Sequence, residues 1–311
     1  MKKLMQKVTG VALVTLMAAS SAGLGAFAAE NGADKIVNIG VTDSLGGVNP
    51  LMMDQTEINK YAADLQFLPL VELDPELNFQ PMLADSVTTE DNQTFTVHID
   101  DAAMWSDGTP VTAEDVEFTI LRLASPVVNN TTMMLYAFEG IGDDGFTEEG
   151  ATSIDGIKVV DDKTITFTAK SPMALTTFEN TYGRYIHTLP KHVLADYSDE
   201  ELMTLDWFNH PDVISGPYFL TDYDTDHYVS YEANADYWKG APKIGKLNLK
   251  IVEGSQIYSG LQSGEIDITH HTMTAIPQED YESIESLDNV KTVYGLPITN
   301  QSAFIQTAKD R

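Results

Sequence analysis

Alternation of apolar and polar positions predicts several strands, and Thr94–Ile99 is the clearest of them. Phe95, Val97 and Ile99 fall on one face, which we expect to be buried, whereas His98 falls on the opposite, solvated face. His98 is therefore interpreted as a surface residue and not as a ligand. Shorter apolar runs predict further strands at 36–41, 70–73, 157–160, 164–168, 217–221, 227–231 and 246–252.

Helical spacing of apolar positions occurs between these strands. After Thr112, which can cap a helix, Val116, Ile120 and Leu123 follow at intervals of four and three residues and form one buried stripe. Two further helices are predicted, at 53–67 and 255–263. Because strands and helices interleave along the whole chain, we expect an α/β fold.

The first 28 residues have the pattern of an export signal. Three lysines precede an apolar run from 8 to 19, and Ala26-Phe27-Ala28 matches the small-residue pattern of a cleavage site. The run is short for a hydrocarbon layer of about 30 Å. We therefore expect cleavage after Ala28 and export to a periplasm or to the cell exterior, with a retained anchor as the alternative.

Charge and cysteine content narrow the function classes. The chain has 18 Lys and Arg against 47 Asp and Glu, a net charge of −29, which disfavours binding to nucleic acid or to anionic lipid. It contains no cysteine, which excludes disulfides, a thiol nucleophile, Cys-based zinc sites and a lipid anchor on an N-terminal cysteine. The apolar share of 43% is sufficient for a real core.

The sequence lacks the common motifs for catalysis and cofactor binding. Neither G-x-S-x-G nor H-E-x-x-H is present. The nearest match to a phosphate loop, from Gly240 to Lys246, lacks the hydroxyl residue that would hold magnesium. The doublet His270-His271 would point its two rings to opposite sides of an extended segment, so we interpret it as two polar residues at a strand exit. No cofactor and no metal are expected.

Several blocks in a fixed order carry a family resemblance. The longest, W-S-D-G-T-P-V-T-A-E-D-V, runs from Trp105 to Val116, and the others are Pro81–Ser86, Ser215–Tyr218, Asn234–Gly240 and Leu261–Ile268. Over about residues 36–305 the chain resembles the family-5 extracellular solute-binding proteins of ABC transporters, the oligopeptide, dipeptide and nickel group. Most residues of these blocks are interpreted as scaffold and not as ligand contacts.

The resemblance implies a fold of the periplasmic-binding-protein-like type II, with two lobes and an extra domain. On that layout we expect a signal peptide at 1–28, lobe I at 29–50 and 185–270, an extra α/β domain at 51–184, and the start of lobe II at 271–311. The second lobe would be largely missing, because members of the family resemble longer chains. The chain is therefore interpreted as an N-terminal fragment or a prematurely ended reading frame.

The resemblance also implies a mechanism without covalent chemistry. Two lobes would close on a ligand, and the closed receptor would dock on the permease subunits of an ABC importer. The ligand would be a peptide, held as an added strand, or another small solute, and the receptor would be a monomer. Charged contacts to the peptide ends would come largely from the lobe that is missing.

Candidate ligand contacts begin in the loop 42–49. This loop leaves a strand at its C-terminal end, where open α/β sheets bind ligands, and it offers Asp43, Ser44, Gly47 and Asn49. Trp105 is a candidate stacking wall, with a core position as the alternative.

Two later segments supply the remaining candidates. Arg184 and Tyr185 follow a glycine and are candidates for binding a carboxylate, with a surface pair as the alternative. His271 and Thr272 follow the strand that is expected to cross between the lobes.

Three alternatives stay open at this stage. Within the family, the solute could be a nickel complex or an oligosaccharide. Outside the family, the chain could be an exported hydrolase, which would need two carboxylates roughly 5–10 Å apart in a cleft. The chain could also be a non-functional remnant that binds nothing.

Overall fold

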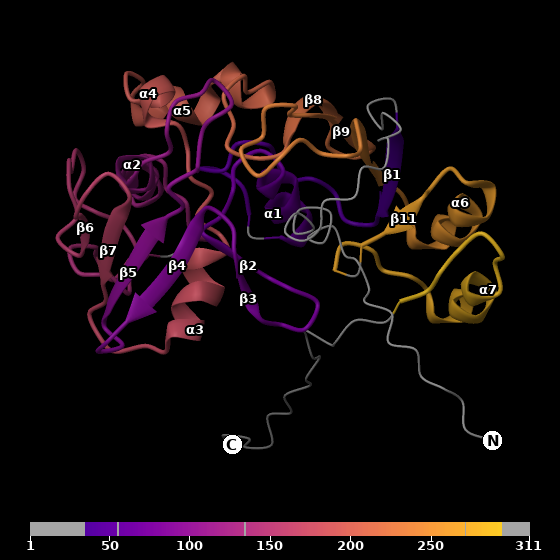
Figure 1. The fold of residues 1–311 in the computed structure, drawn as a ribbon, viewed down its shortest axis with the longest axis horizontal. Helices are drawn as coiled ribbons and strands as arrows, with labels where there is room; N and C mark the ends of the chain where they lie inside the picture. Colours follow the sequence, from indigo (N-terminus) through magenta and orange to yellow (C-terminus); the bar gives the residue numbers. More distant parts are fainter. Residues whose placement is uncertain (1–34, 55, 134, 271, 294–311) are drawn as a thin grey trace, which may run out of the picture.

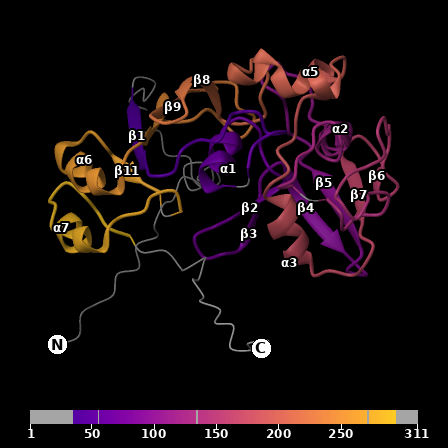
Figure 2. The same ribbon diagram turned by 180° about the vertical axis from the view of Figure 1, so that it is seen from behind.

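The computed structural model describes residues 35–54, 56–133, 135–270 and 272–293 (Figure 1). The predicted signal segment and the last part of the chain lie outside these ranges. The described strands form sheets of five, four and two strands. Both views place α6 and α7 at one end of the molecule and the four-stranded sheet at the other, with α1 between them (Figure 2).

The five-stranded sheet joins segments that are far apart in the sequence. Its strand order is β11-β1-β10-β9-β8, in which β1 runs parallel to β10 and β11, and β8, β9 and β10 are antiparallel neighbours. The bounds are Ile36–Val41 (β1), Tyr218–Asp224 (β8), Tyr228–Ala233 (β9), Lys246–Ile251 (β10) and Ile268–Thr269 (β11). The strands predicted at 36–41, 217–221, 227–231 and 246–252 are confirmed, with shifts of a few residues at their ends.

Helices border this sheet on one face and at one edge. α1 (Glu57–Asp64) shares a hydrophobic core with β1, β8, β9 and β10, and α6 (Ile257–Ser263) and α7 (Tyr281–Glu285) form a small cluster of their own. The predicted helix at 53–67 was too long. Thr56 caps α1 through its side-chain oxygen, and the backbone before it forms a turn in which Met52 and Met53 donate to the Asn49 carbonyl.

The four-stranded sheet is antiparallel and has the order β4-β5-β7-β6. The bounds are Ala84–Thr89 (β4), Thr94–Ile99 (β5), Ile157–Val159 (β6) and Thr164–Thr168 (β7). On β5, Phe95, Val97 and Ile99 are fully buried, and His98 lies on the other face and contacts Asp85 (Nδ1···Oδ1 3.0 Å). The predicted alternation on this strand is therefore confirmed.

α2 (Ala113–Leu123) covers the buried face of the four-stranded sheet. Thr112 and Asp115 form the capping box of the helix, and Val116, Ile120 and Leu123 are buried against β6 and β7, as predicted.

The remaining elements are short: β2 (Val71–Leu73), β3 (Phe79–Pro81), α3 (Leu175–Phe178), α4 (Lys191–Leu194), α5 (Asp199–Thr204), a π-helical turn at Glu179–Gly183, and 3-10 turns at Asp206–Asn209, Gly254–Gln256 and Gln278–Asp280.

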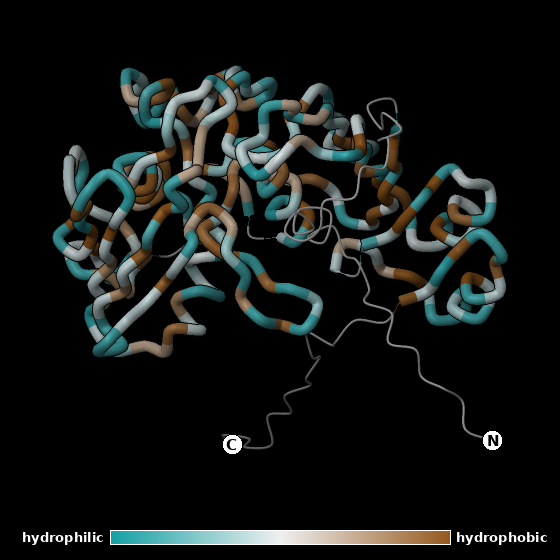
Figure 3. The backbone as a smooth tube through the Cα atoms, viewed as in Figure 1, coloured by the Kyte–Doolittle hydropathy of each residue, from teal (hydrophilic) through white to brown (hydrophobic). Residues whose placement is uncertain are grey.

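Two main hydrophobic cores result from this arrangement, one beside each of the larger sheets. Hydrophobic and hydrophilic residues alternate along the whole tube, and the loop that joins β2 and β3 is mostly hydrophilic (Figure 3). Within the described ranges, every helix is too short or too polar to span a bilayer.

Phe178 offers a test of the packing around the four-stranded sheet. It is fully buried, and its ring stacks on Phe95 (centroids 4.5 Å apart) and meets the edge of Phe167 (5.1 Å). We expect Phe178→Ala to lower the free energy of unfolding by about 3–5 kcal/mol, because a cavity would remain where α3 packs on the sheet.

Urea denaturation followed by circular dichroism measures this loss. Tyr136→Ala is the control, because Tyr136 is 49% exposed and its loss should change the free energy of unfolding by no more than about 0.5 kcal/mol. Equal effects of the two substitutions would contradict the packing described here.

Candidate functional site

The loop after β1 is held on two sides. The Thr42 amide donates to the Met273 carbonyl (2.9 Å), the Leu45 amide to Thr225 (3.0 Å), and the Gly46 amide to Asn59 Oδ1 on α1 (2.7 Å). These bonds fix the loop against the five-stranded sheet and α1. The predicted contacts Asp43 and Ser44 are exposed on this loop, whereas Gly47 and Asn49 are half-buried.

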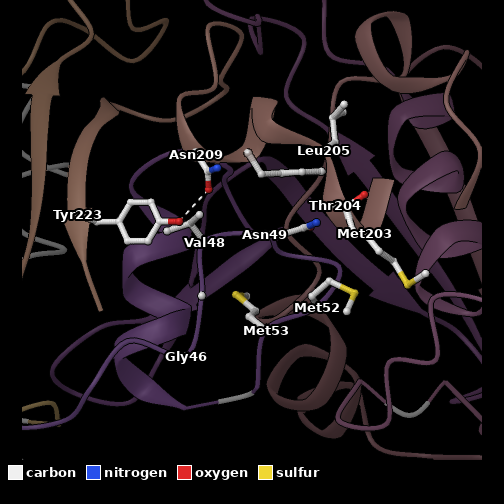
Figure 4. A pocket seen from close by; sticks show the side chains of 12 residues that line it. Gly46, Val48, Asn49, Met52, Met53, Met203, Thr204, Leu205, Asn209 and Tyr223 are labelled. Atoms are coloured by element: carbon white, nitrogen blue, oxygen red, sulfur yellow. Dashed lines mark hydrogen bonds between the residues drawn. The ribbon is translucent and has the colours of Figure 1, made fainter. Parts of the chain in front are cut away.

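Gly47 and Asn49 line a cavity of about 300 Å³. The cavity lies between the loop after β1, the end of α5 with the 3-10 turn that follows it, and Tyr223 on β8 (Figure 4). Its full lining is Gly46, Gly47, Val48, Asn49, Met52, Met53, Met203, Thr204, Leu205, Phe208, Asn209 and Tyr223. Val48 and Tyr223 belong to the core of the five-stranded sheet and Phe208 to the other core, so the cavity lies at the seam between the two.

Three polar side chains of the cavity, those of Asn49, Asn209 and Tyr223, already bond to the protein. Asn49 donates through Nδ2 to the Leu202 carbonyl (2.9 Å) and accepts from the Leu51 amide through Oδ1 (3.0 Å). Tyr223 donates its hydroxyl to Asn209 Oδ1 (2.7 Å). By contrast, the amides of Gly47, Val48 and Asn49 donate no hydrogen bond within the described part of the chain.

The lining of this cavity is uncharged. Its lining contains no Asp, Glu, His, Lys or Arg, so it has no carboxylate or imidazole for acid–base catalysis. Thioether, aliphatic and aromatic side chains share its walls with glycines, asparagines and a threonine, and polar atoms make up the larger part of the exposed lining.

A second cavity, of about 320 Å³, lies on β9 and β10. Glu265 is the one carboxylate that lines it, and it pairs with Lys250 (3.2 Å). Neither of these cavities therefore offers the two facing carboxylates that a glycoside hydrolase needs. In the described ranges, His, Asp and Glu residues form no group of three or more that could hold a metal ion.

The structure does not place Trp105 at a cavity wall. Trp105 is 2% exposed and donates its indole N–H to Asp115 Oδ2 (3.3 Å), beside the start of α2. Its ring belongs to the core of the four-stranded sheet. Trp105 therefore occupies the core position that was given as the alternative, because α2 and the 105–111 loop enclose its ring.

Arg184 binds a carboxylate, but this carboxylate belongs to the protein itself. Its Nε donates to Glu72 Oε1 (2.7 Å), and Arg184 is 8% exposed. The neighbouring Tyr185 is half-buried, and its ring lies 5.8 Å from Lys60 Nζ. The alternative of a surface pair is therefore wrong for Arg184, and its guanidinium is already used inside the fold.

Lys60 is the centre of this buried ionic cluster. Its fully buried ammonium contacts Asp64 (2.6 Å) and Glu72, and His187 Nε2 contacts the other oxygen of Asp64 (2.8 Å). Burial by itself lowers the pKa of Lys60, but the two carboxylates outweigh this effect and the pKa is raised. Burial by itself raises the pKa of Asp64, but Lys60 and His187 outweigh it and the pKa is lowered.

Tyr61 connects this cluster with the last predicted segment. Its ring lies 4.4 Å from Lys60 Nζ on one side and 4.5 Å from the ring of His270 on the other. Thr272 Oγ1 contacts His270 Nδ1 (2.9 Å). The predicted contact His271 lies outside the described residues.

Sequence reasoning missed Met52, Met53, Met203, Leu205 and Tyr223 as lining residues of the cavity. The only signal near them was the Met52-Met53 pair directly after the candidate loop. Met203 and Tyr223 come from segments about 150 residues later, and the pattern of the chain does not indicate that these segments meet the loop.

Comparison with known proteins places the chain in a family. A sequence profile for bacterial extracellular solute-binding proteins, family 5, matches residues 78–309. The chain belongs to this family. Its members are by description solute-binding proteins found outside the cytoplasm.

Curated relatives and solved structures agree with this assignment. A putative ABC transporter peptide-binding protein of Brucella ovis is 32% identical, covering 66% of this chain and 36% of the relative. The periplasmic oligopeptide-binding protein OppA of Salmonella typhimurium is 26% identical, and the match covers 76% of this chain and 44% of OppA. The dipeptide-binding protein DppE of Bacillus subtilis is 28% identical, and the match covers 69% of this chain and 38% of DppE. The chain thus spans less than half the length of these relatives.

Among solved structures, AppA from Bacillus subtilis in complex with a nonapeptide superposes with a TM-score of 0.66 at 21% identity, covering 82% of this chain and 47% of AppA. The substrate-binding protein CtaP from Listeria monocytogenes is 28% identical and superposes with a TM-score of 0.58, and the match covers 81% of this chain and 46% of CtaP. The α/β fold of the periplasmic-binding-protein type is therefore confirmed, and the chain corresponds to about half of these structures.

The ionic cluster can be tested by removing its central cation. Lys60→Met keeps a side chain of similar length but leaves Asp64 and Glu72 buried without the ammonium. We expect a loss of about 3–5 kcal/mol in the free energy of unfolding. The matched control is Lys246→Met, because Lys246 is 53% exposed in a pair with Glu232 (3.5 Å) and should contribute no more than about 1 kcal/mol. Equal losses of unfolding free energy in the two variants would show that the buried ion pairs contribute no more to stability than the exposed pair.

The lowered pKa of Asp64 predicts a loss of stability in acid. A carboxyl whose pKa is lower in the folded state stabilises the fold above its unfolded pKa, and this contribution disappears as the pH falls through the folded pKa. Below about pH 4, lowering the pH should therefore reduce the free energy of unfolding less steeply in Asp64→Asn than in the wild type. Denaturant titrations between pH 2 and 6 measure these slopes, with the exposed Asp226→Asn as control. A slope unchanged by Asp64→Asn would contradict the prediction.

Proposed function

We propose that the chain is the extracytoplasmic substrate-binding component of an ABC importer and that it binds oligopeptides or dipeptides. The observation that carries this proposal is the agreement among its relatives, which are named as peptide-binding and dipeptide-binding proteins. The nonapeptide bound to AppA supports the same ligand class for the shared fold. No observation on this chain favours a nickel complex or an oligosaccharide.

The mechanism we propose is capture without covalent change. A peptide enters beside the loop after β1, the protein closes on it, and permease subunits of the importer receive it. The loop residues Asp43, Ser44, Gly47 and Asn49 are the proposed contacts from the sheet edge, and Tyr185 and Thr272 are proposed contacts farther along the seam. The family description, which is that of solute-binding proteins, supports a role in binding.

The domain layout is part of the same proposal. We assign residues 29–50 and 185–270 to lobe I, 51–184 to the extra domain and 271–311 to the start of lobe II, after a signal peptide at 1–28. Support comes from the five-stranded sheet, which combines β1 with strands after residue 217, and from the four-stranded sheet, which uses only residues between 84 and 168. By contrast, α1 falls within 51–184 but packs on the five-stranded sheet.

Peptide binding is expected to raise the melting temperature of the purified protein. A peptide at a concentration of 100 times its Kd adds about 2.7 kcal/mol to the free energy of unfolding. For a chain of this size the melting temperature should rise by about 5 °C. Differential scanning fluorimetry with peptide mixtures of two to nine residues measures the shift, and calorimetry gives the Kd.

Three comparison ligands make this experiment specific. An oligosaccharide mixture, a nickel–histidine complex and a mixture of free amino acids should leave the melting temperature unchanged. A shift with one of these and none with peptides would replace the proposed ligand. No shift with any of them would indicate a protein that binds nothing.

A further inference from the structure

The side-chain amide of Asn59 joins the two ends of one segment of the candidate site. Asn59 is the third residue of α1 and is 1% exposed. Its Oδ1 accepts from the Gly46 amide (2.7 Å), and its Nδ2 donates to the Asp54 carbonyl (3.2 Å). One buried side chain therefore holds both ends of residues 46–54, which we call the bridged segment.

The glycine at position 46 fits this contact. A Cβ placed on Gly46 would lie 2.8 Å from Asn59 Nδ2, which is closer than such atoms approach in proteins. Gly46 does not have a positive φ, so its backbone conformation does not by itself require glycine. To make room, Asn59 Nδ2 would have to leave the Asp54 carbonyl. The close approach of Asn59 thus explains why a residue without a side chain stands at this position.

The bridge comes directly before the part of the loop that offers free donors. The amides of Gly47, Val48 and Asn49 donate no hydrogen bond to any residue that the structure describes, and they follow the bonded amide of Gly46. Gly47 and Asn49 are among the proposed peptide contacts. Donors of this kind bind more tightly when their positions are fixed beforehand, because a mobile segment loses conformational entropy on binding. Asn59 provides such a fixed position from inside the fold.

We propose that Asn59 is a positioning residue for peptide binding. Its burial prevents contact with the peptide, so it acts through Gly46 and Asp54 by holding the bridged segment in the arrangement that binds. The inference rests on the proposed function and adds to it a residue outside the ligand contacts. Without the bridge, the binding arrangement would be a fraction of the ligand-free population, and the apparent Kd would rise by the inverse of that fraction.

Asn59→Ala tests this role, with Asn234→Ala as the matched control. Asn234 is 4% exposed, donates to the Gly216 carbonyl (3.1 Å), accepts from the Asp236 amide (3.0 Å) and lines neither cavity. Each protein is titrated by calorimetry with pentaalanine and with the mixture of peptides of two to nine residues, well below its melting temperature. We expect the apparent Kd to rise at least about tenfold in Asn59→Ala and to stay within about twofold in Asn234→Ala.

Gly46→Ala reaches the same bridge from its other partner. The added methyl group should displace Asn59 Nδ2 and raise the apparent Kd at least about fivefold. In the Asn59→Ala background the space is empty, so adding Gly46→Ala should change the apparent Kd by less than about twofold. This non-additivity distinguishes a bridge between the two residues from two independent effects on stability.

Hydrogen exchange of the ligand-free protein gives a readout that needs no peptide. The amides of Gly46 and Met52 are hydrogen-bonded at the start and near the end of the bridged segment. Their exchange, followed by NMR, should be at least about tenfold faster in Asn59→Ala than in the wild type and unchanged in Asn234→Ala, because the segment opens more often without the bridge.

The outcomes separate the positioning role from the function as a whole. If the wild type binds peptide and Asn59→Ala binds as tightly, or if both asparagine variants lose affinity equally, the positioning role is wrong and the peptide function stands. If Asn59→Ala is unfolded at the assay temperature, Gly46→Ala alone decides, and an unchanged Kd overturns the role. If neither pentaalanine nor the peptide mixture binds the wild type, the proposed function is wrong and the positioning role falls with it.

Discussion

The connection between the two hydrophobic cores depends on the buried charges around Lys60. Two cations, Lys60 and Arg184, face two carboxylates, Asp64 and Glu72, in a region with almost no exposed side-chain surface. Each of these charges alone would be costly to remove from water, and the set is tolerable only when all partners are present. The helix α1, the strand β2 and the segment after the π-helical turn must therefore dock together.

This requirement fixes the position of the candidate site. α1 belongs to the core of the five-stranded sheet, whereas residues next to Arg184 belong to the other core. One further bond crosses the same seam: Asn49, next to Val48 of the five-stranded-sheet core, donates to the carbonyl of Leu202, which belongs to the other core. The cavity lies between elements that are held from both sides, so its rigid walls are preorganised, and the methionine side chains remain adjustable.

The sequence predicted those parts of the fold in which neighbouring residues decide the outcome. β5 and α2 were predicted correctly because alternation and capping are local patterns. Lys60 could not be predicted as fully buried, because it lies in a polar stretch and one of its carboxylate partners, Glu72, follows twelve residues later on another element. Arg184 was predicted as a contact for the carboxylate of a ligand, and the sequence does not show that its guanidinium is already paired with the internal Glu72.

The residues that identify the family are therefore different from those that line the cavity. In the longest block, Trp105 and Asp115 bond to each other, Asp107 contacts His192, and Thr112 caps α2, so these residues maintain the scaffold. The cavity is lined instead by Met52, Met203 and other residues outside that block. A scaffold residue is constrained by partners within the chain, whereas a wall residue that is half exposed can change with little cost in stability. Divergence within such a family can thus change the walls of this cavity while the sheets and the ionic cluster keep the fold.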